Sequence, residues 1–261
     1  MGNSQLQVLQ SEIINCRLCP RLVEHREAIA QVKRRAYHDW TYWGRPVPSF
    51  GDPNARVLIA GLAPGAHGSN RTGRMFTGDR SGDILYKVLF DTGFASKPAS
   101  TSASDGLTLT DAYITAAAHC APPGNKPTPE EFRNCRPYLE RELELLSNVR
   151  VVVALGRLAF DIYLGILKLQ NKLERRSLFA FGHNILHILE TGQGGSLPAL
   201  ISSYHPSQQN TSTGKLTEPM LRAVFENAQR LIRDGSGDRG RRGRASQEIL
   251  PDDPQNPGSQ Q

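Results

Sequence analysis

The sequence predicts an α/β fold: a three-layer α/β/α sandwich around a mainly parallel central sheet. Short apolar runs rich in β-branched residues alternate with longer segments of helical periodicity, which is the pattern of βαβ units. The runs are apolar at nearly every position, as expected for parallel strands that are buried on both faces. With 261 residues, 38% hydrophobic and 21% charged, the chain is a globular one and not a fibrous or wholly disordered one.

Five apolar runs are the predicted strands, and the fourth of them is the weakest because it is interrupted by a histidine. In chain order they cover 56–60, 112–116, 149–154, 184–189 and 199–204. Helical periodicity covers 6–15, 20–34, 82–92, 129–146, 157–167 and 216–233. Ligands of such sheets bind beyond the carboxyl ends of the strands. We therefore expect the loops that begin at Gly61, His119 and His205 to converge on one crevice.

The folded domain is predicted to span 1–233. Residues 234–261 are dominated by Gly, Arg, Pro and Gln without an apolar period, which predicts a disordered tail. The polar start has no signal-peptide core, and the longest apolar run is far shorter than the roughly 20 residues that span a bilayer. We expect a cytoplasmic protein without a membrane partner. The net charge of +6 suits a polyanionic partner.

The four cysteines form two pairs, Cys16 with Cys19 and Cys120 with Cys135. In a cytosolic protein an even set of this kind indicates a metal before a disulfide. Four thiolates suit a tetrahedral zinc ion or a [4Fe–4S] cluster, and the spacing alone does not choose between them. Four unliganded cysteines are the alternative. Either metal would tie the N-terminal segment to the loop after the second strand, a structural role.

A glycine-rich loop follows the first strand, with six glycines between Gly61 and Gly82. Glycines let backbone N–H groups approach a ligand closely. The loop is neither a P-loop nor a dinucleotide fingerprint, and Phe76 among its glycines favours a ligand cradle over a plain surface loop. His205 follows the last parallel strand and precedes Pro206. At that place it could donate a hydrogen bond to a developing oxyanion, although a lone histidine is usually an ordinary polar residue.

Five motifs in this order resemble those of the family 5 uracil-DNA glycosylases, the iron–sulfur branch often called type b. The resemblance covers roughly Cys16 to Arg233. The motifs are Cys16-x2-Cys19, Gly61-Leu-Ala-Pro-Gly65, Gly73-Arg-Met-Phe76-Thr-Gly-Asp79, Cys120-Ala-Pro-Pro123 and His205-Pro-Ser-Gln-Gln-Asn210.

The resemblance implies a monofunctional enzyme that cuts the N-glycosidic bond of uracil in DNA and leaves an abasic site. It implies a [4Fe–4S] cluster rather than zinc on the four cysteines, DNA containing deaminated bases as the partner, no organic cofactor, a monomer, and a place at the nucleoid. By the same analogy the His205 loop enters the minor groove. The implied base pocket comprises Gly61, Leu62, Ala63, Gly65 and Phe76, with Asn210 of the histidine loop also binding substrate.

The chain departs from its relatives at two places. Where related glycosylases carry an acidic residue in the first motif, this chain has Leu62 and Ala63. Asp79 is the nearest acidic substitute for positioning water and stabilising the cation, with a helix N-cap as its alternative role; Asn70 is a second candidate for holding water.

The second departure is Ala116, which stands where family 4 enzymes place an asparagine that reads the uracil edge. A site without that reader rejects analogues poorly. We therefore predict that hypoxanthine, xanthine and modified uracils are also released.

Five basic residues in or beside these loops are candidate phosphate contacts: Arg71, Arg74, Arg80, Lys126 and Lys215. Four aromatic residues precede the first strand and are expected to pack as core around the metal lobe: Tyr37, Trp40, Tyr42 and Trp43. Two rival functions remain open. One is a non-catalytic, metal-stapled nucleic-acid binding module, and the other is an iron–sulfur electron carrier.

Overall fold

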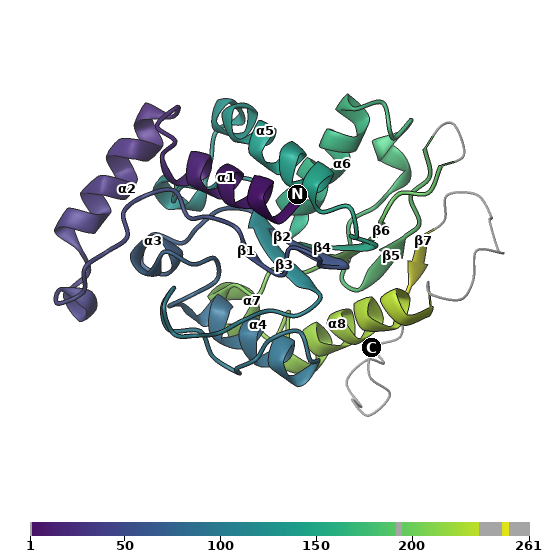
Figure 1. Ribbon diagram of the computed structural model, residues 1–261. Helices are drawn as coiled ribbons and strands as arrows, with labels where there is room; N and C mark the ends of the chain where they lie inside the picture. Colours follow the sequence, from purple (N-terminus) through teal and green to yellow (C-terminus); the bar gives the residue numbers. More distant parts are fainter. Residues whose placement is uncertain (1, 192–194, 235–246, 251–261) are drawn as a thin grey trace.

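The computed structural model describes residues 2–191, 195–234 and 247–250, and in this part of the chain it contains one sheet of seven strands (Figure 1). Their order across the sheet is β1-β3-β2-β4-β6-β5-β7. The strands are β1 (Phe50–Gly51), β2 (Val57–Gly61), β3 (Ala112–Ala116), β4 (Val151–Leu155), β5 (Ile185–His187), β6 (Ala199–Ser203) and β7 (Gln247–Ile249). The central four, β3-β2-β4-β6, are parallel, whereas β1, β5 and β7 pair antiparallel at the two edges.

The register brings the carboxyl ends of the parallel strands to one edge. Gly61 at the end of β2 lies level with Ala116 at the end of β3, and Leu155 at the end of β4 lies level with Ser203 at the end of β6. The loops that leave these four strands therefore begin side by side. This edge is where an open parallel sheet binds its ligands.

Helices cover both faces of the sheet (Figure 1). On one face lie α1 (Gly2–Ile14), α5 (Pro129–Leu145) and α6 (Arg157–Leu169), and on the other lie α4 (Arg80–Asp91) and α8 (Glu218–Asp234). Each face has its own buried cluster, because alternate strand residues point to opposite sides. The helix α2 (Pro20–Val32) contacts the short α3 (Ser69–Thr72), and α7 (Gln208–Ser212) follows the histidine loop.

The predicted fold class is confirmed, and every predicted strand and helix is present with its bounds shifted by a few residues. Local signals explain the accurate helix starts: Thr128 and Glu131 form a capping box at α5, with Pro129 as its first residue. The strand β1 was not predicted, because two residues carry no periodic signal. None of the described helices is long and apolar enough to cross a membrane.

The predicted tail, 234–261, needs a correction where it is described. Residues 247–249 form β7, which pairs with β5, and Leu250 is buried. The interpretation as a tail rested on the lack of an apolar period, but an edge strand is held by backbone hydrogen bonds that need none. The rest of that segment, 235–246 and 251–261, lies outside the described residues.

His187 is a buried polar residue of β5 in the sheet. Its Nε2 atom lies 3.1 Å from the hydroxyl of Ser202, and its ring contacts Phe160 and Phe179. Burial lowers the pKa of His187 from 6.5 to about 4. Folding therefore holds this imidazole neutral at pH values at which the unfolded chain binds a proton.

We predict that the free energy of unfolding declines as the pH falls from 6.5 to 4, with roughly 3 kcal/mol of the decline due to His187. The unfolded chain takes up a proton there in this window and the folded chain does not. Denaturant titration at several pH values should show a smaller decline for His187→Gln, whereas His38→Gln, at an exposed histidine, should behave like the wild type. Equal declines in all three proteins would contradict the prediction.

Candidate active site

A cavity of about 270 Å³ opens at the carboxyl edge of the sheet. It collects residues from the loops after β2, β3 and β6, which are adjacent in the sheet or separated only by β4. Its lining comprises Gly61, Leu62, Ala63, Gly65, Ser69, Met75, Phe76, Asp79, Ser81, Ala116, Asn125, His205 and Ser207. Eight of the ten residues that the sequence analysis assigned to catalysis or substrate binding are among them.

Phe76 and His205 both line this cavity, and their rings are neighbours. Their centroids are 5.8 Å apart and their planes are tilted by 30°. Phe76 has a left-handed backbone with φ of 52°, and a Cβ atom at Gly61 would come within 2.9 Å of its ring. Behind His205, a Cβ atom at Gly156 would lie 3.3 Å from the histidine Cβ. Each ring residue thus packs directly against the backbone of a glycine, Phe76 against Gly61 and His205 against Gly156.

Asp79 lines the cavity and caps a helix; of the two roles that the sequence left open for it, the structure shows the helix cap, and the catalytic role stays a prediction. Its Oδ1 atom accepts hydrogen bonds from the backbone N–H groups of Ser81 and Gly82, at 3.0 and 3.1 Å, and so caps α4. Its Oδ2 atom faces the glycine-rich loop: a Cβ atom would meet it at 3.0 Å from Gly65 and at 2.3 Å from Gly68. The helix therefore holds the carboxylate at the cavity without occupying both of its oxygens.

Two opposing influences act on the pKa of His205. Burial lowers it from the ordinary value, and the negative charge of Asp79 raises it by less, so that the net shift is downward. The imidazole is therefore neutral at pH 7 and offers one ring N–H as a donor. A neutral donor beside a fixed carboxylate suits a reaction that develops negative charge near the histidine and positive charge near Asp79.

Two predicted site residues do not reach the cavity. Asn70 is 0% exposed and its amide donates to the backbone carbonyl of Arg26 at 3.2 Å, away from the cavity. Asn210 donates to the backbone carbonyl of His205 at 2.8 Å and thereby braces the histidine loop. The loop after β3 reaches the cavity through Ala116 and Asn125, while His119 turns to the cysteines.

Five lining residues were not predicted as site residues: Ser69, Met75, Ser81, Asn125 and Ser207. Met75 and Ser207 lie within the predicted motifs, Ser81 and Asn125 lie two residues beyond one, and Ser69 lies between two of them, so proximity in sequence was the available signal. Asn125 follows the Cys120-Ala-Pro-Pro123 motif by two residues and has a left-handed backbone with φ of 58°. Asn125 is exposed and supplies the side-chain amide among the residues that line the cavity. A side-chain amide can both donate and accept hydrogen bonds at the edge of a base.

The expected phosphate contacts need a correction at two positions. Arg71 and Arg74 are buried, at 5% and 4% exposure, and their guanidinium groups are used inside the protein. Arg74 donates to Asp105 at 2.6 Å and to the carbonyl of Ala103 at 2.9 Å. Sequence position placed these arginines beside the site, but position alone does not show which way a side chain turns.

The remaining three expected phosphate contacts lie at the surface or beside an aromatic ring. Arg80 and Lys126 are exposed. The ammonium group of Lys215 lies 4.9 Å from the centre of the Tyr204 ring. Their contact with phosphate stays a prediction.

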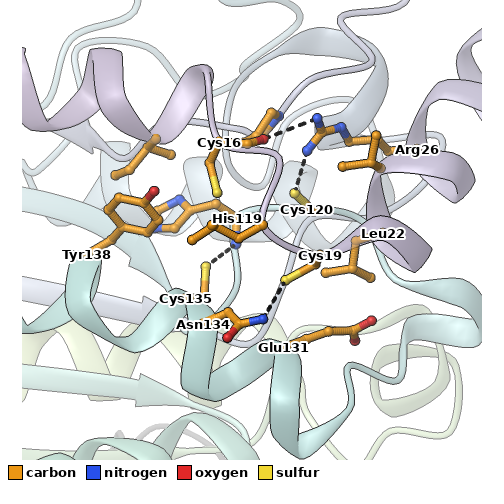
Figure 2. A pocket seen from close by; sticks show the side chains of 14 residues that line it. Cys16, Cys19, Leu22, Arg26, His119, Cys120, Glu131, Asn134, Cys135 and Tyr138 are labelled. Carbon is orange, nitrogen blue, oxygen red and sulfur yellow. Dashed lines mark hydrogen bonds between the residues drawn. The ribbon is translucent and has the colours of Figure 1, made fainter.

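All four cysteines line a second pocket, and none of them is in a disulfide (Figure 2). Cys16 and Cys19 come from the turn between α1 and α2, Cys120 from the loop after β3, and Cys135 from α5. Figure 2 shows their sulfurs turned toward one interior space. In the part of the chain that the structure describes, no group of three or more His, Cys, Asp or Glu is arranged to hold a metal ion.

Hydrogen-bond donors surround these sulfurs. Arg26, only 2% exposed, donates from Nη1 to the sulfur of Cys120 at 2.8 Å. The backbone N–H of His119 lies 3.4 Å from the sulfur of Cys135, and the amide of Asn134 donates to Cys19 at 3.5 Å. Donors of this kind stabilise negatively charged sulfur. The buried guanidinium of Arg26 is itself stabilised by a negative charge beside it, because a buried charge without a partner is costly.

Burial raises the pKa of three of these thiols. The pKa of Cys120 rises to about 11, with Arg26 opposing the rise, and the pKa values of Cys19 and Cys135 also rise. These three thiols alone would therefore be neutral at pH 7, and a metal that binds them must displace their protons.

Comparison with known proteins places this site in a family. The model of the Uracil DNA glycosylase superfamily matches residues 48–229. A type-5 uracil-DNA glycosylase of Thermus thermophilus is 52% identical over 216 residues, 83% of this chain and 93% of its own. The type-5 enzyme of Mycobacterium leprae is 48% identical over 231 residues, 88% of this chain and 97% of its own. A type-4 uracil-DNA glycosylase of Archaeoglobus fulgidus is 31% identical over 181 residues, 69% and 76% of the two chains.

Proposed function

The chain belongs to the uracil DNA glycosylase superfamily, and on that premise we propose that it is a monofunctional glycosylase that excises uracil from DNA. The observation that carries the proposal is the single cavity that Phe76 and His205 share at the carboxyl edge of the sheet. A base must leave the duplex to reach such a cavity, which costs a few kcal/mol of pairing and stacking. Stacking on Phe76 returns roughly 1–3 kcal/mol of that cost.

Excision breaks the bond between the sugar C1′ and N1 of uracil. The electron pair of that bond leaves with the base, whose negative charge spreads onto its carbonyl oxygen, and the sugar becomes an oxocarbenium cation. Water then adds to C1′ and loses a proton, which leaves an abasic site. In our proposal the neutral His205 donates a hydrogen bond to the departing oxygen, a contribution of about 3–4 kcal/mol. Backbone N–H groups near Leu62 and Ala63 line the same cavity and add to it.

We assign stabilisation of the cation to Asp79. Its Oδ1 atom is held by two backbone N–H groups of α4, whereas its Oδ2 atom lies at the glycine-rich loop that lines the cavity. A carboxylate about 4 Å from the cation contributes about 4 kcal/mol at an effective dielectric constant of 20. The same oxygen can orient the attacking water. In this assignment Asp79 takes the role of the acidic residue that related glycosylases carry where this chain has Leu62 and Ala63. Asn70 is not needed to hold the water.

Removing the imidazole in His205→Ala should slow uracil release about 100-fold or more while DNA binding is retained, because the donor acts on charge that develops only during bond breaking. Single-turnover assays on a uracil duplex measure the rate, and a binding titration measures the affinity. The exposed His38→Ala is the control. The loss should be smaller for 5-fluorouracil, whose anion is intrinsically more stable.

The outcome also separates the rival functions. A non-catalytic binding module would release no uracil in the wild type, and an electron carrier would need neither Phe76 nor His205. Equal losses for uracil and 5-fluorouracil would contradict the role that we assign to His205.

We further propose that the enzyme releases other deaminated bases, namely hypoxanthine, xanthine and modified uracils. Ala116 lines the cavity at the end of β3, directly beside Gly61 in the sheet. Its methyl group offers no hydrogen bond to the edge of a base, so the floor of the cavity does not discriminate between uracil and its analogues. The amide of Asn125 comes from an exposed part of the loop after β3 and can meet bases of different shapes.

We predict that the wild type releases hypoxanthine from inosine-containing duplex, and that Ala116→Asn lowers this activity relative to uracil release by about tenfold or more. Alkaline cleavage at abasic sites measures both activities. Ala116→Leu, similar in size but without an amide, should lower the two activities alike. An intact inosine duplex after incubation with the wild type would contradict the proposal.

For the four cysteines we propose a [4Fe–4S] cluster. The donor set fits it: four free thiols, N–H donors to three sulfurs, and a buried guanidinium that balances negative charge. A single zinc ion would need sulfurs roughly 3.8 Å apart, whereas each cysteine of a cluster binds a different iron and the sulfurs stand farther apart. The cluster would fasten α2 to the loop after β3.

Purified protein should therefore contain iron and inorganic sulfide in equal amounts and absorb visible light, whereas a zinc protein is colourless. Cys120→Ser should lower the metal content and the melting temperature, because the ligand also pairs with the buried Arg26. Metal analysis, absorption and thermal denaturation provide the readouts. Zinc without iron in protein purified under exclusion of air would contradict the proposal.

The remaining parts of the proposal follow from this chemistry. Hydrolysis of the glycosidic bond needs water and no organic cofactor. One cavity within one chain holds all the residues that we invoke, so we propose a monomer. Because the substrate is genomic DNA, we place the enzyme in the cytoplasm at the nucleoid.

A further inference from the structure

A basic segment precedes the part of the chain that the superfamily model matches, which begins at residue 48. Residues 33–45, which we call the basic arm, connect α2 to β1 and include the short helix η1 (Arg35–Tyr37). The four aromatic residues that we expected to pack around the metal lobe belong to the arm. Two of them, Tyr37 and Trp40, instead stack on Arg71 of the glycine-rich loop.

The other two aromatic residues fix the arm to the same loop. The backbone N–H of Trp43 donates to the carbonyl of Arg71 at 3.0 Å. The hydroxyl of Tyr42 is hydrogen-bonded to Nδ1 of His67 at 3.1 Å. The indole of Trp43 also lies where a Cβ atom at Gly73 would come within 3.0 Å. The arm and the glycine-rich loop therefore form one packed unit.

Arg71 is the centre of this unit. Its guanidinium carbon lies 3.9 Å from the ring centre of Tyr37 and 4.2 Å from that of Trp40. The same guanidinium donates to the carbonyls of His67 and Gly78, both at 2.8 Å. Gly78 directly precedes the aspartate that caps α4 and lines the cavity. A macromolecule held by the arm is thereby held in register with the cavity.

The charge of the arm is one-sided. It carries Lys33, Arg34, Arg35 and Arg45, and its single acidic residue, Asp39, pairs with the neighbouring histidine. Among the described residues none of these four cations forms an ion pair with a carboxylate, in contrast to Arg17, Arg21 and Arg157 elsewhere on the surface. The three arginines are exposed. Trp40 beside them is 39% exposed.

Resting on the proposed function, in which DNA is the substrate, we propose that the basic arm is a contact surface for the DNA backbone beside the excised base. Exposed cations without carboxylate partners gain most from phosphates, because neutralising phosphates releases counterions from the DNA. Guanidinium groups also match phosphate geometry. The rigid link through Arg71 sets the distance between the gripped phosphates and the flipped base.

The test compares two variants that remove the same charge. Arg34→Gln combined with Arg35→Gln changes the arm. Lys168→Gln combined with Lys172→Gln changes exposed lysines at and just after the end of α6, on another part of the molecule. Binding is measured with a duplex that carries an uncleavable tetrahydrofuran abasic analogue, over a range of salt concentrations. Single-turnover uracil release is measured at saturating enzyme.

The arm variant should bind about tenfold more weakly, and its plot of log affinity against log salt should be shallower by about 1.8, the value for two lost phosphate contacts. Its rate of uracil release at saturation should stay within twofold of the wild type, and the lysine variant should match the wild type in both measurements. An unchanged slope in the arm variant, or equal weakening in both variants, would overturn the proposal. If the wild type itself released no uracil, the proposed function would fail instead.

Discussion

The site depends on one carboxylate that is held from two sides. Asp79 is fixed by the first backbone N–H groups of α4, and its free oxygen fits only because Gly65 and Gly68 carry no side chain. A Cβ atom at Gly82 would lie 1.6 Å from the carbonyl oxygen of Phe76, so the same helix start also fixes the aromatic wall of the cavity. The glycines of this loop thus allow the backbone to pack closely around Asp79 and Phe76. The cavity is the space that remains between these packed groups.

The cysteine pocket and the cavity are mechanically connected through α2. The side chain of Arg26 reaches the sulfur of Cys120, while its backbone carbonyl accepts a hydrogen bond from Asn70 in α3. The backbone N–H of Asn70 in turn donates to the carbonyl of Gly65 at 3.0 Å. A group that ties the cysteines together would therefore steady the glycine-rich loop from behind. The metal that we propose at that place would therefore serve a structural role through these contacts.

The sequence predicted the layers, the strands and most of the cavity, because periodicity, caps and the rule of carboxyl-edge loops are local or topological signals. It did not predict which side chains turn inward. Asn70 and Arg74 stand beside cavity residues in the chain, yet both are buried in contacts of their own. Asn125 was missed because the motif just before it, Cys120-Ala-Pro-Pro123, was interpreted as part of a metal site. The strand β7 was missed because edge pairing depends on a partner strand distant in sequence.

Arginine position shows why net charge is a weak guide to a DNA-binding surface. Three arginines near the site face inward: Arg26 toward sulfur, Arg71 between two aromatic rings and Arg74 toward Asp105. Each is a cation in the composition, but its guanidinium is buried and bonded inside the protein, so it does not face a phosphate. The cations that are able to contact DNA phosphates are the exposed ones that have no carboxylate partner. The basic arm holds four cations, three of them exposed arginines, and one acidic residue, which is half of the surplus of +6, and the buried Arg71 joins it to the superfamily core.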